Sequence, residues 1–598
     1  METVPPRRSP FSLRARMKPI LSLVVFLASF PMTIAASEPD ARPSVILVVT
    51  DDQGYGDLRA HGNWIIRTPH LDRLRNESVR LTNFHVDPTC SPTRAALLTG
   101  RYSTRTGVWH TVMGRSLLHR DEVTMADVFR EAGYRTAMIG KWHLGDNYPY
   151  RPQDRGFDET FHHGGGGIGQ TPDHWGNTYH DAIFLRNGEP VQTRGYCTDV
   201  FFAEAESFIA QTRSRPFFLY LATNVPHSPF TVDERYRAPY AAQGVPEPMD
   251  SFYGMIENMD ENLGRLLARL EELGLAENTI VIWATDNGTA AGVVTDENET
   301  EDSTDGSWRG FAAGMRGKKG SVYEGGHRVP CFIRWPAGGI EGGRDVDALT
   351  AHFDLLPTLS EWCDLPRREL AWDGRSLARL IRGESDSEPR TLFVHRQRRE
   401  IPPKWVDSAV MTERWRLVNG RELYDIARDP GQTSDVAASH PSVVERLRED
   451  YETWWTSLAP ALRRDTPLVI GASEANPTRL NAMDWHNENI RQIPWHQRQV
   501  AELPAANGYW VVEVARAGEY EFILRHQPSE APRRLEATQA KVAVGDRTAE
   551  VKVVPSSTEV ALRLELPTGI ARLQTWLADS SKPEETRGAF FVEIRRID

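Results

Sequence analysis

The sequence predicts an α/β domain in which helices cover both faces of a mainly parallel sheet, followed by a small α+β subdomain and an appended all-β domain. Two observations lead to this prediction. Short apolar runs alternate with helical patterns between residues 42 and 365, and continuous apolar runs between helices are typical of parallel strands buried on both faces. After residue 480 polar and apolar residues alternate, which is typical of half-exposed strands.

The first element expected is a cleaved signal peptide at residues 1–36. Five basic residues from Arg7 to Lys18 precede an apolar run that begins at Ile20, and small residues follow at 35–37. This order is typical of signal peptides. A membrane anchor is the alternative, although the run is short of a comfortable span and Pro31 interrupts it. We therefore expect an exported protein, periplasmic or secreted, with no stable membrane insertion after cleavage.

The remaining boundaries follow changes of pattern along the chain. The α/β domain is expected at 37–370, with strands that begin at Ser44, Phe217 and Thr279 and an amphipathic helix at 255–273. Short strands and a helix predict an α+β subdomain. The segments expected after the α/β domain are the subdomain at 371–460, a linker at 461–479 and a β-sandwich-like domain at 480–598.

The overall charge bears on possible partners. The chain of 598 residues has a formal net charge of -12. A general nucleic-acid binder needs a basic face to neutralise phosphates, so we expect no nucleic-acid partner. A polyanionic substrate would have to be met by a local basic pocket.

Two acidic motifs follow two predicted strands. Asp51 and Asp52 come after the run that begins at Ser44, while Asp286 and Asn287 come after the run that begins at Thr279. Ligands of open α/β sheets gather at the carboxyl ends of strands. Three carboxylates and one amide carbonyl suit Ca²⁺ or Mg²⁺ rather than zinc. Each motif alone reads as a turn, but the pair predicts a metal site.

A cysteine motif precedes a run of good helix formers. In Cys90-Ser-Pro-Thr-Arg94, Pro92 suits the first turn of a helix. Residues four apart share a helix face, so Arg94 is expected beside Cys90, where the amino end of the helix favours an anion. A buried structural cysteine is the alternative interpretation of this motif.

Three basic motifs could complete a pocket for an anion: Lys141-Trp-His143, Asn224-Val-Pro-His227 and Lys318-Lys319-Gly320. A single histidine at a strand end is usually structural, and a lysine pair is usually a solvated surface. The occurrence of all three together with Cys90 and the acidic motifs favours a catalytic site.

In their order and spacing, these motifs resemble the type I sulfatase family, arylsulfatase-like members of the alkaline phosphatase superfamily, over about residues 42–460. The resemblance implies an alkaline phosphatase-like fold. It also implies that a formylglycine-generating enzyme oxidises Cys90 to formylglycine during maturation, and that the hydrated aldehyde is the nucleophile. The implied metal is Ca²⁺, with Mg²⁺ possible, and its implied ligands are Asp51, Asp52, Asp286, Asn287 and the modified Cys90.

The resemblance also implies roles for the basic residues. Those that contact the sulfate are Lys141, His143, His227 and Lys319. Arg94 steadies the aldehyde hydrate, His227 with Lys319 protonates the leaving alcohol, and His143 acts as the base that allows sulfate to leave. Histidine has a suitable pKa for both proton transfers.

The expected function is therefore hydrolysis of an aryl or carbohydrate sulfate ester, with a sulfated small molecule or glycan as substrate. A phosphate or phosphonate ester hydrolase of the same superfamily is one alternative. A non-catalytic glycan-binding protein that uses the carboxy-terminal domain is another. The candidates for the rim of the pocket, where rings could stack on a sugar or aryl group, are Trp109, His110, His174 and Trp175; packing within the loops is the alternative interpretation of all four.

Overall fold

The computed structural model describes residues 42–597 apart from 295–308, 367–369 and 385–387. The expected signal peptide lies outside the described residues. Among the helices that the structure does describe, none is both long and apolar enough to cross a membrane.

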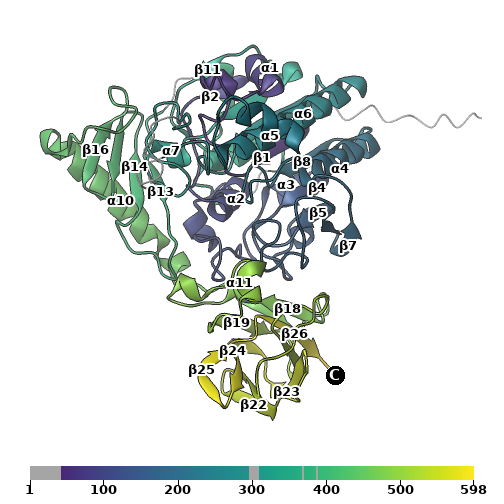
Figure 1. Cartoon of the computed structure of the whole chain (residues 1–598). Coiled ribbons are helices and arrows are strands. Elements are labelled where there is room, and N and C mark those ends of the chain that lie inside the picture. The colour runs from purple at the N-terminus through teal and green to yellow at the C-terminus, as the bar shows by residue number, and fades with distance from the viewer. Residues whose placement is uncertain (1–41, 295–308, 367–369, 385–387, 598) are drawn as a thin grey trace, which may run out of the picture. The chain divides into compact units, whose positions relative to one another are not determined.

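A ten-stranded sheet forms the centre of the first large unit (Figure 1). β1 (Ser44–Thr50) lies between β9 (Thr279–Thr285) and β8 (Phe217–Ala222), and both pairings are parallel. The parallel run continues through β4 (Arg135–Lys141) and β5 (Glu159–His163). The outer strands are β10 (Cys331–Arg334), β2 (Val79–Leu81), β11 (Asp345–Val346), β6 (Ile183–Arg186) and β7 (Glu189–Gln192). The predicted mainly parallel sheet is confirmed.

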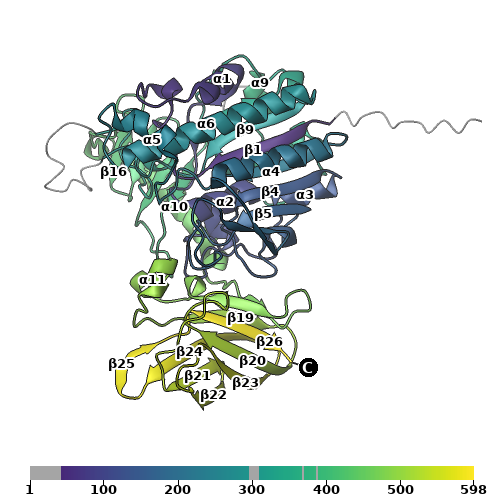
Figure 2. The ribbon, with the colours of Figure 1, turned by 45° about the vertical axis from the view of Figure 1, so that its right-hand side comes forward.

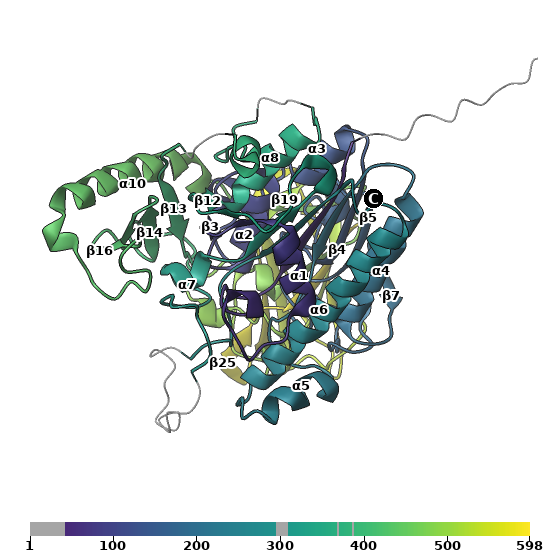
Figure 3. The same ribbon diagram turned by 90° about the horizontal axis from the view of Figure 1, so that it is seen from above.

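Helices cover both faces of this sheet because successive side chains of its central strands point to opposite sides. Ile46 and Val48 of β1 belong to the core under one helical layer, whereas Leu47 and Val49 belong to the core under the other. Figures 2 and 3 show α4 and α6 on one side of the strands and α2 on the other. The first layer holds α1 (Pro69–Glu77), α4 (Cys197–Thr212) and α6 (Met249–Glu272), with α5 (Glu234–Ala241) packed on α6; the second holds α2 (Cys90–Thr99), α3 (Met125–Glu131), α8 (Leu355–Trp362) and α9 (Ala378–Arg382).

A smaller antiparallel sheet follows in the chain. Its order is β13 (Leu392–His395), β14 (Ser408–Met411), β15 (Trp415–Val418) and β16 (Glu422–Asp425). The helix α10 (Pro441–Leu462) covers one face, where Leu417 and Leu423 pack with Leu447 and Tyr451. Two short strands, β3 (Phe84–His85) and β12 (Thr350–Ala351), pair separately, and α7 (Glu324–His327) is a single turn.

The last region consists of two sheets that share one apolar core. Burial alternates along β20 (Gly518–Arg525), as expected for strands with one face in the core. One sheet contains β17 (Leu468–Ile470), β19 (Tyr509–Val514), β24 (Gly569–Asp579), β21 (Gln539–Val544), β22 (Arg547–Lys552) and β25 (Lys582–Arg587); the other contains β18 (Thr478–Asn481), β26 (Phe591–Arg596), β20 (Gly518–Arg525) and β23 (Val560–Leu566).

The segment expected as a linker at 461–479 is not free of regular structure. α10 continues to Leu462, and β17 and β18 both begin before residue 479. The three residues of β17 are too few to show a period, and they are recognisable as a strand only through parallel pairing with β19, about forty residues later.

The core of the sandwich extends into a loop of the α/β unit. Val112, Met113 and Leu117 belong to the same apolar cluster as the sandwich strands. The backbone N–H of Met113 donates to the carbonyl of Met483 at 2.9 Å. The hydroxyl of Tyr150 donates to the carbonyl of Pro467 at 2.6 Å. These contacts join the two units through apolar packing as well as hydrogen bonds.

Candidate active site

The acidic motifs meet at one edge of the sheet. Thr50 and Thr285 are partners in the parallel pairing of β1 and β9, so Asp51 and Asp286 leave the two strands at the same level. The backbone N–H of Asp52 donates to Asp286 Oδ1 at 3.1 Å, and Asn287 Nδ2 donates to Asp52 Oδ1 at 2.9 Å. All four side chains are buried.

This cluster fits a hard cation. Asp51 Oδ1 and Asn287 Oδ1 are buried and have no hydrogen-bond partner among the described residues. Such oxygens are costly to bury unless something binds them. Ligand atoms of Asp51, Cys90 and Asp286 all lie within 4.8 Å of one another. The donors are mostly carboxylate and amide oxygens, which suit Ca²⁺ or Mg²⁺.

Cys90 is the first residue of α2, which ends at Gly100 in the left-handed conformation. The side chain of Arg94, one turn later, is fully buried and donates to Asp286 Oδ2 through two nitrogens, at 2.7 and 3.2 Å. A third contact runs to the carbonyl of Lys141 at 3.0 Å. Burial is the largest influence on the pKa of Asp286 and would raise it, but Arg94, Lys141 and Lys319 together hold this pKa below its ordinary value.

Two lysines reach the same carboxylates. Lys141 Nζ lies 2.6 Å from Asp51 Oδ2, and Lys319 Nζ lies 2.6 Å from Asp52 Oδ1. Burial and the nearby Asp286 raise the pKa of Asp51 despite Lys141. Burial is also the largest influence on the pKa of Asp52 and would raise it, but Lys319, with smaller contributions from neighbours that include Lys141 and Asn287, holds that pKa below its ordinary value. The predicted Lys319, rather than its neighbour Lys318, is therefore the lysine that pairs with Asp52.

Two histidines flank the cluster. His143 Nε2 donates to the carbonyl of Thr111 at 2.9 Å, and its Nδ1 is buried without a partner among the described residues. His227 Nδ1 donates to the carbonyl of Ser228 at 2.7 Å, so its Nε2 faces Asp52 Oδ2 at 3.8 Å. Burial is the main cause that lowers the pKa of both histidines, and the charge of a lysine is the second cause. The second cause is Lys141 for His143 and Lys319 for His227, whose pKa falls to about 3. Both rings are therefore neutral at pH 7 and free to accept a proton.

The backbone at His143 is strained, with φ of 60° in the left-handed region. Strain of this kind is typical of functional positions. The loop at 164–177 closes over the ring, and Gly166 lies so near that a Cβ built there would meet His143 Cε1 at 2.1 Å. Only glycine leaves room for the imidazole.

Gln497 of the last region anchors this loop. Its Nε2 donates to the carbonyls of Gln170 and Asp173, both at 3.1 Å, and its Oε1 accepts from the N–H of Gly176 at 2.9 Å. The carbonyl of Trp495 accepts from the N–H of Thr171 at 3.0 Å. The sandwich region thus supports the loop that covers His143.

These groups open into a cavity of about 350 Å³. Its walls come from three parts of the chain: Cys90, Thr111, Val112, His143, Gln170, His227, Ser228, Lys319 and Gly320 from the α/β unit, Arg396 and Arg398 after β13, and Ile490 and Trp495 from the sandwich region. The last four were not predicted. They lie far along the chain from the other motifs, and no spacing signal links them to those motifs.

The four residues expected at the rim are not among those that line the cavity. Trp109 is buried, with Arg115 4.7 Å above its ring and its indole N–H bonded to the carbonyl of Arg399. His110 is buried as well. Trp175 packs edge-on against Phe591, and the partly exposed His174 lies beside it in the chain. The two tryptophans therefore serve packing, and the rim expectation is wrong.

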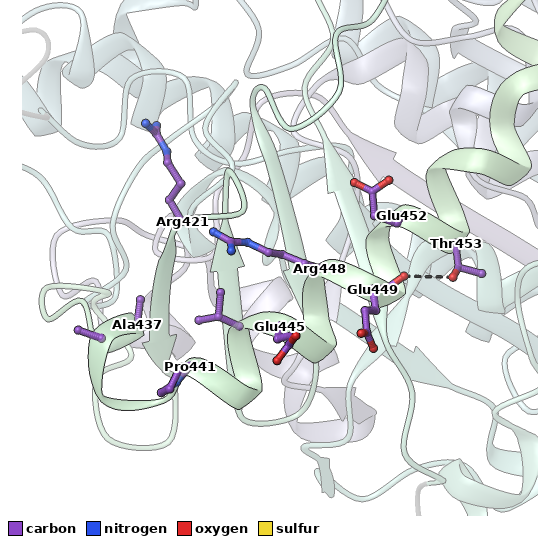
Figure 4. Close-up of a pocket in the computed structure, with 10 residues that line it drawn as sticks. Arg421, Ala437, Pro441, Glu445, Arg448, Glu449, Glu452 and Thr453 are labelled. Atoms are coloured by element: carbon purple, nitrogen blue, oxygen red, sulfur yellow. Dashed lines mark hydrogen bonds between the residues drawn. The ribbon is translucent and has the colours of Figure 1, made fainter.

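A second hollow, of about 800 Å³, lies along α10 and contains none of the predicted site residues (Figure 4). Glu445, Glu449 and Glu452 stand beside Arg421 and Arg448 in it. Arg448 donates to the carbonyl of Gly420, and Thr453 donates to the carbonyl of Glu449 at 3.0 Å. Charges of both signs line this hollow, and its lining lacks the combination of cysteine, histidine and lysine found in the first cavity.

Comparisons with known proteins agree on one family. The family model described as Sulfatase matches residues 43–365. The chain is 31% identical over 470 residues to steryl-sulfatase of Mus musculus, which covers 64% of this chain and 72% of the relative. It is 28% identical over 517 residues to N-acetylgalactosamine-6-O-sulfatase of Bacteroides thetaiotaomicron, and this match covers 73% of the chain and 98% of the relative. The crystal structure of Ps i-CgsB in complex with k-i-k-neocarrahexaose matches with a TM-score of 0.60 and 27% identity, and this match covers 69% of the chain and 92% of the solved chain.

Proposed function

The chain belongs to the sulfatase family, and from that premise we propose that this sulfate-ester hydrolase releases inorganic sulfate from an aryl or carbohydrate sulfate at the Cys90 cavity. The observation that carries the proposal is the convergence of Cys90, the acidic cluster and the four basic side chains at one edge of the sheet. A phosphate or phosphonate ester remains the alternative substrate.

Asp51, Asp52, Asp286 and Asn287 would hold Ca²⁺, with Mg²⁺ as the alternative, and formylglycine made from Cys90 would complete the set. Together these groups would supply an oxygen nucleophile of lowered pKa and a positive charge that offsets the charge developing on the sulfate. Arg94, held by Asp286, would orient the side chain at position 90 from the same helix face.

The protein's own side chains would bind the ester and move protons. Lys141 and Lys319 would neutralise the sulfate oxygens, since each ammonium already lies at the acidic cluster. His227, fixed through Nδ1, would present Nε2 to the leaving oxygen. Because the ring is neutral in the free protein, it would take up a proton on Nε2 when the negative charge of the sulfate enters the cavity and then pass that proton to the leaving oxygen. Lys319 would assist that transfer. His143, whose Nδ1 is unpartnered, would accept the proton whose removal lets sulfate leave.

Maturation and location are part of the proposal. The basic and apolar composition of residues 1–36 supports export to the periplasm or the medium. A formylglycine-generating enzyme would act on Cys90 before the chain folds, because Cys90 is buried in the folded protein. The relative named as an N-acetylgalactosamine-6-O-sulfatase supports a carbohydrate sulfate, and the steryl-sulfatase supports an apolar alcohol.

The test combines mass spectrometry with turnover. Protein made together with a formylglycine-generating enzyme is digested, and the peptide that contains Cys90 is examined for the aldehyde. The same protein is assayed with 4-nitrophenyl sulfate and 4-nitrophenyl phosphate, beside Cys90→Ala. We expect the aldehyde, preferred turnover of the sulfate and no turnover by the variant. Dominant phosphate turnover, or full activity with an unmodified thiol, would overturn the proposal.

A further inference from the structure

Two arginines line the cavity, one without an ion-pair partner among the described residues and one with a single long contact to a carboxylate. Arg398 has neither a hydrogen-bond nor an ion-pair partner within the described residues. Arg396 has one side-chain contact, from Nη1 to Asp407 Oδ2 at 3.4 Å, and its Nε is buried without a partner. Both guanidinium groups line the cavity that contains Cys90.

The positions of these arginines relate them to the catalytic groups. Arg396 lies beside the Lys319–Gly320 segment, because a Cβ built on Gly320 would stand 3.4 Å from Arg396 Nε. Arg398 is exposed as a residue, but partial desolvation of its guanidinium and the neighbouring Arg396 both lower its pKa, while Cys90 and Asp52 oppose that effect. Two like charges lie near one another, and no carboxylate of the described part of the chain pairs with Arg398, so an anion would stabilise this site.

The scissile sulfate does not need these arginines, since Lys141, His143, His227 and Lys319 already surround the acidic cluster. Arginine differs from lysine in presenting a planar fork that matches two oxygens of a carboxylate or sulfate. From the sandwich region, Ile490 and Trp495 add an apolar wall to the same cavity, suited to the face of a sugar ring.

We propose that Arg396 and Arg398 form a second anion-binding subsite, so that the preferred substrate is a sulfated saccharide with a further anionic group on the same ring or an adjacent one. This inference rests on the proposed function for the position of the scissile ester. The further group is a carboxylate or a second sulfate, which share the paired oxygens that a guanidinium binds.

The test is calorimetric binding to the full-length, Ca²⁺-loaded Cys90→Ala protein, which measures affinity without turnover. Three panels of positional isomers serve as probes: neutral disaccharides with one sulfate, neutral disaccharides with two sulfates, and uronic-acid disaccharides with one sulfate. We expect the best dianionic probe to bind roughly ten- to hundred-fold more tightly than the best monoanionic one, as for a gained charge-assisted hydrogen bond. The panel that gains affinity identifies the second group.

Arg396→Gln and Arg398→Gln, each added to Cys90→Ala, are expected to lose most of that margin. Arg421→Gln, which alters an exposed arginine of the other hollow, is the matched control and should keep it. The subsite would be overturned if all three panels bound with equal affinity, or if the affinity difference survived both arginine substitutions. It would also be overturned if the substitutions weakened the binding of monoanionic and dianionic probes equally. Turnover of 4-nitrophenyl sulfate by the Cys90 protein tests the proposed function separately, so the two failures are distinguishable.

Discussion

Gly166→Ala is the sharpest test of how His143 is held. A Cβ at this position would stand 2.1 Å from His143 Cε1 and 2.4 Å from Nε2, whereas nonbonded carbons approach to about 3.5 Å. The ring would have to move by roughly 1.5 Å, away from its hydrogen bond to Thr111. Displacement of a catalytic group by about 1 Å can reduce the rate by about 10²-fold. We therefore expect kcat for 4-nitrophenyl sulfate to fall by about 10²-fold or more.

The step affected should be the release of sulfate, because His143 is the proposed base there. Stopped-flow measurements should show a burst of 4-nitrophenol followed by a slow steady state. Gly167→Ala is the matched control, since the nearest atom to its Cβ would be the flexible amide of Gln170 at 3.3 Å. Thermal unfolding of both variants checks the fold. If Gly166→Ala turned over sulfate as fast as Gly167→Ala, the account of His143 would be refuted.

Three further predictions concern charge. Removing divalent cations with EDTA should lower the melting temperature and Ca²⁺ should restore it, with a smaller gain in Asn287→Ala; an unchanged melting curve would count against the metal site. Arg94→Met should cost about 3–5 kcal/mol in denaturant unfolding, because Asp286 then becomes an unpaired buried charge, and adding Asp286→Asn should recover part of that cost rather than increase it. Burial, with Asp146 nearby, raises the pKa of Asp484 to about 8. The folded state keeps this proton between about pH 4 and pH 8 while the unfolded state releases it, so this carboxyl lowers stability by about 1.4 kcal/mol for each pH unit across that window. The advantage of Asp484→Asn in unfolding free energy should grow from pH 5 to pH 8, and a constant difference would contradict the assignment.

The sheet and the acidic cluster could be predicted because both depend on local patterns. A run of five apolar residues, Val45 to Val49, identifies β1, and the rule that parallel strands end at a common edge brings Asp51 and Asp286 together. The helix that begins at Cys90 followed from Pro92 and the residues after it.

The cavity wall formed by Arg396, Arg398, Ile490 and Trp495 could not be predicted, because no local sequence pattern marks these residues as part of a site. Arg398 resembles any surface arginine until the fold brings the segment after β13 to the cavity that contains Cys90, and Trp495 reaches that cavity only through the fold of a later domain. Trp109 was a candidate for the rim because it is an aromatic residue near polar motifs. Such a residue is equally suited to packing, and Trp109 packs on Arg115. Long-range placement, rather than residue type, decides these positions.

The shared core of Val112, Met113 and Leu117 with the sandwich strands has a practical consequence for protein engineering. Domains joined only by a polar linker can be exchanged between enzymes, but this sandwich cannot be exchanged without disrupting the core that it shares with the α/β unit. A chain ended at Arg464 would expose the apolar side chains of that loop to water and remove Gln497, the brace of the 164–177 loop. Grafting a new specificity onto this scaffold would therefore mean redesigning the sandwich and the catalytic loops as a single unit.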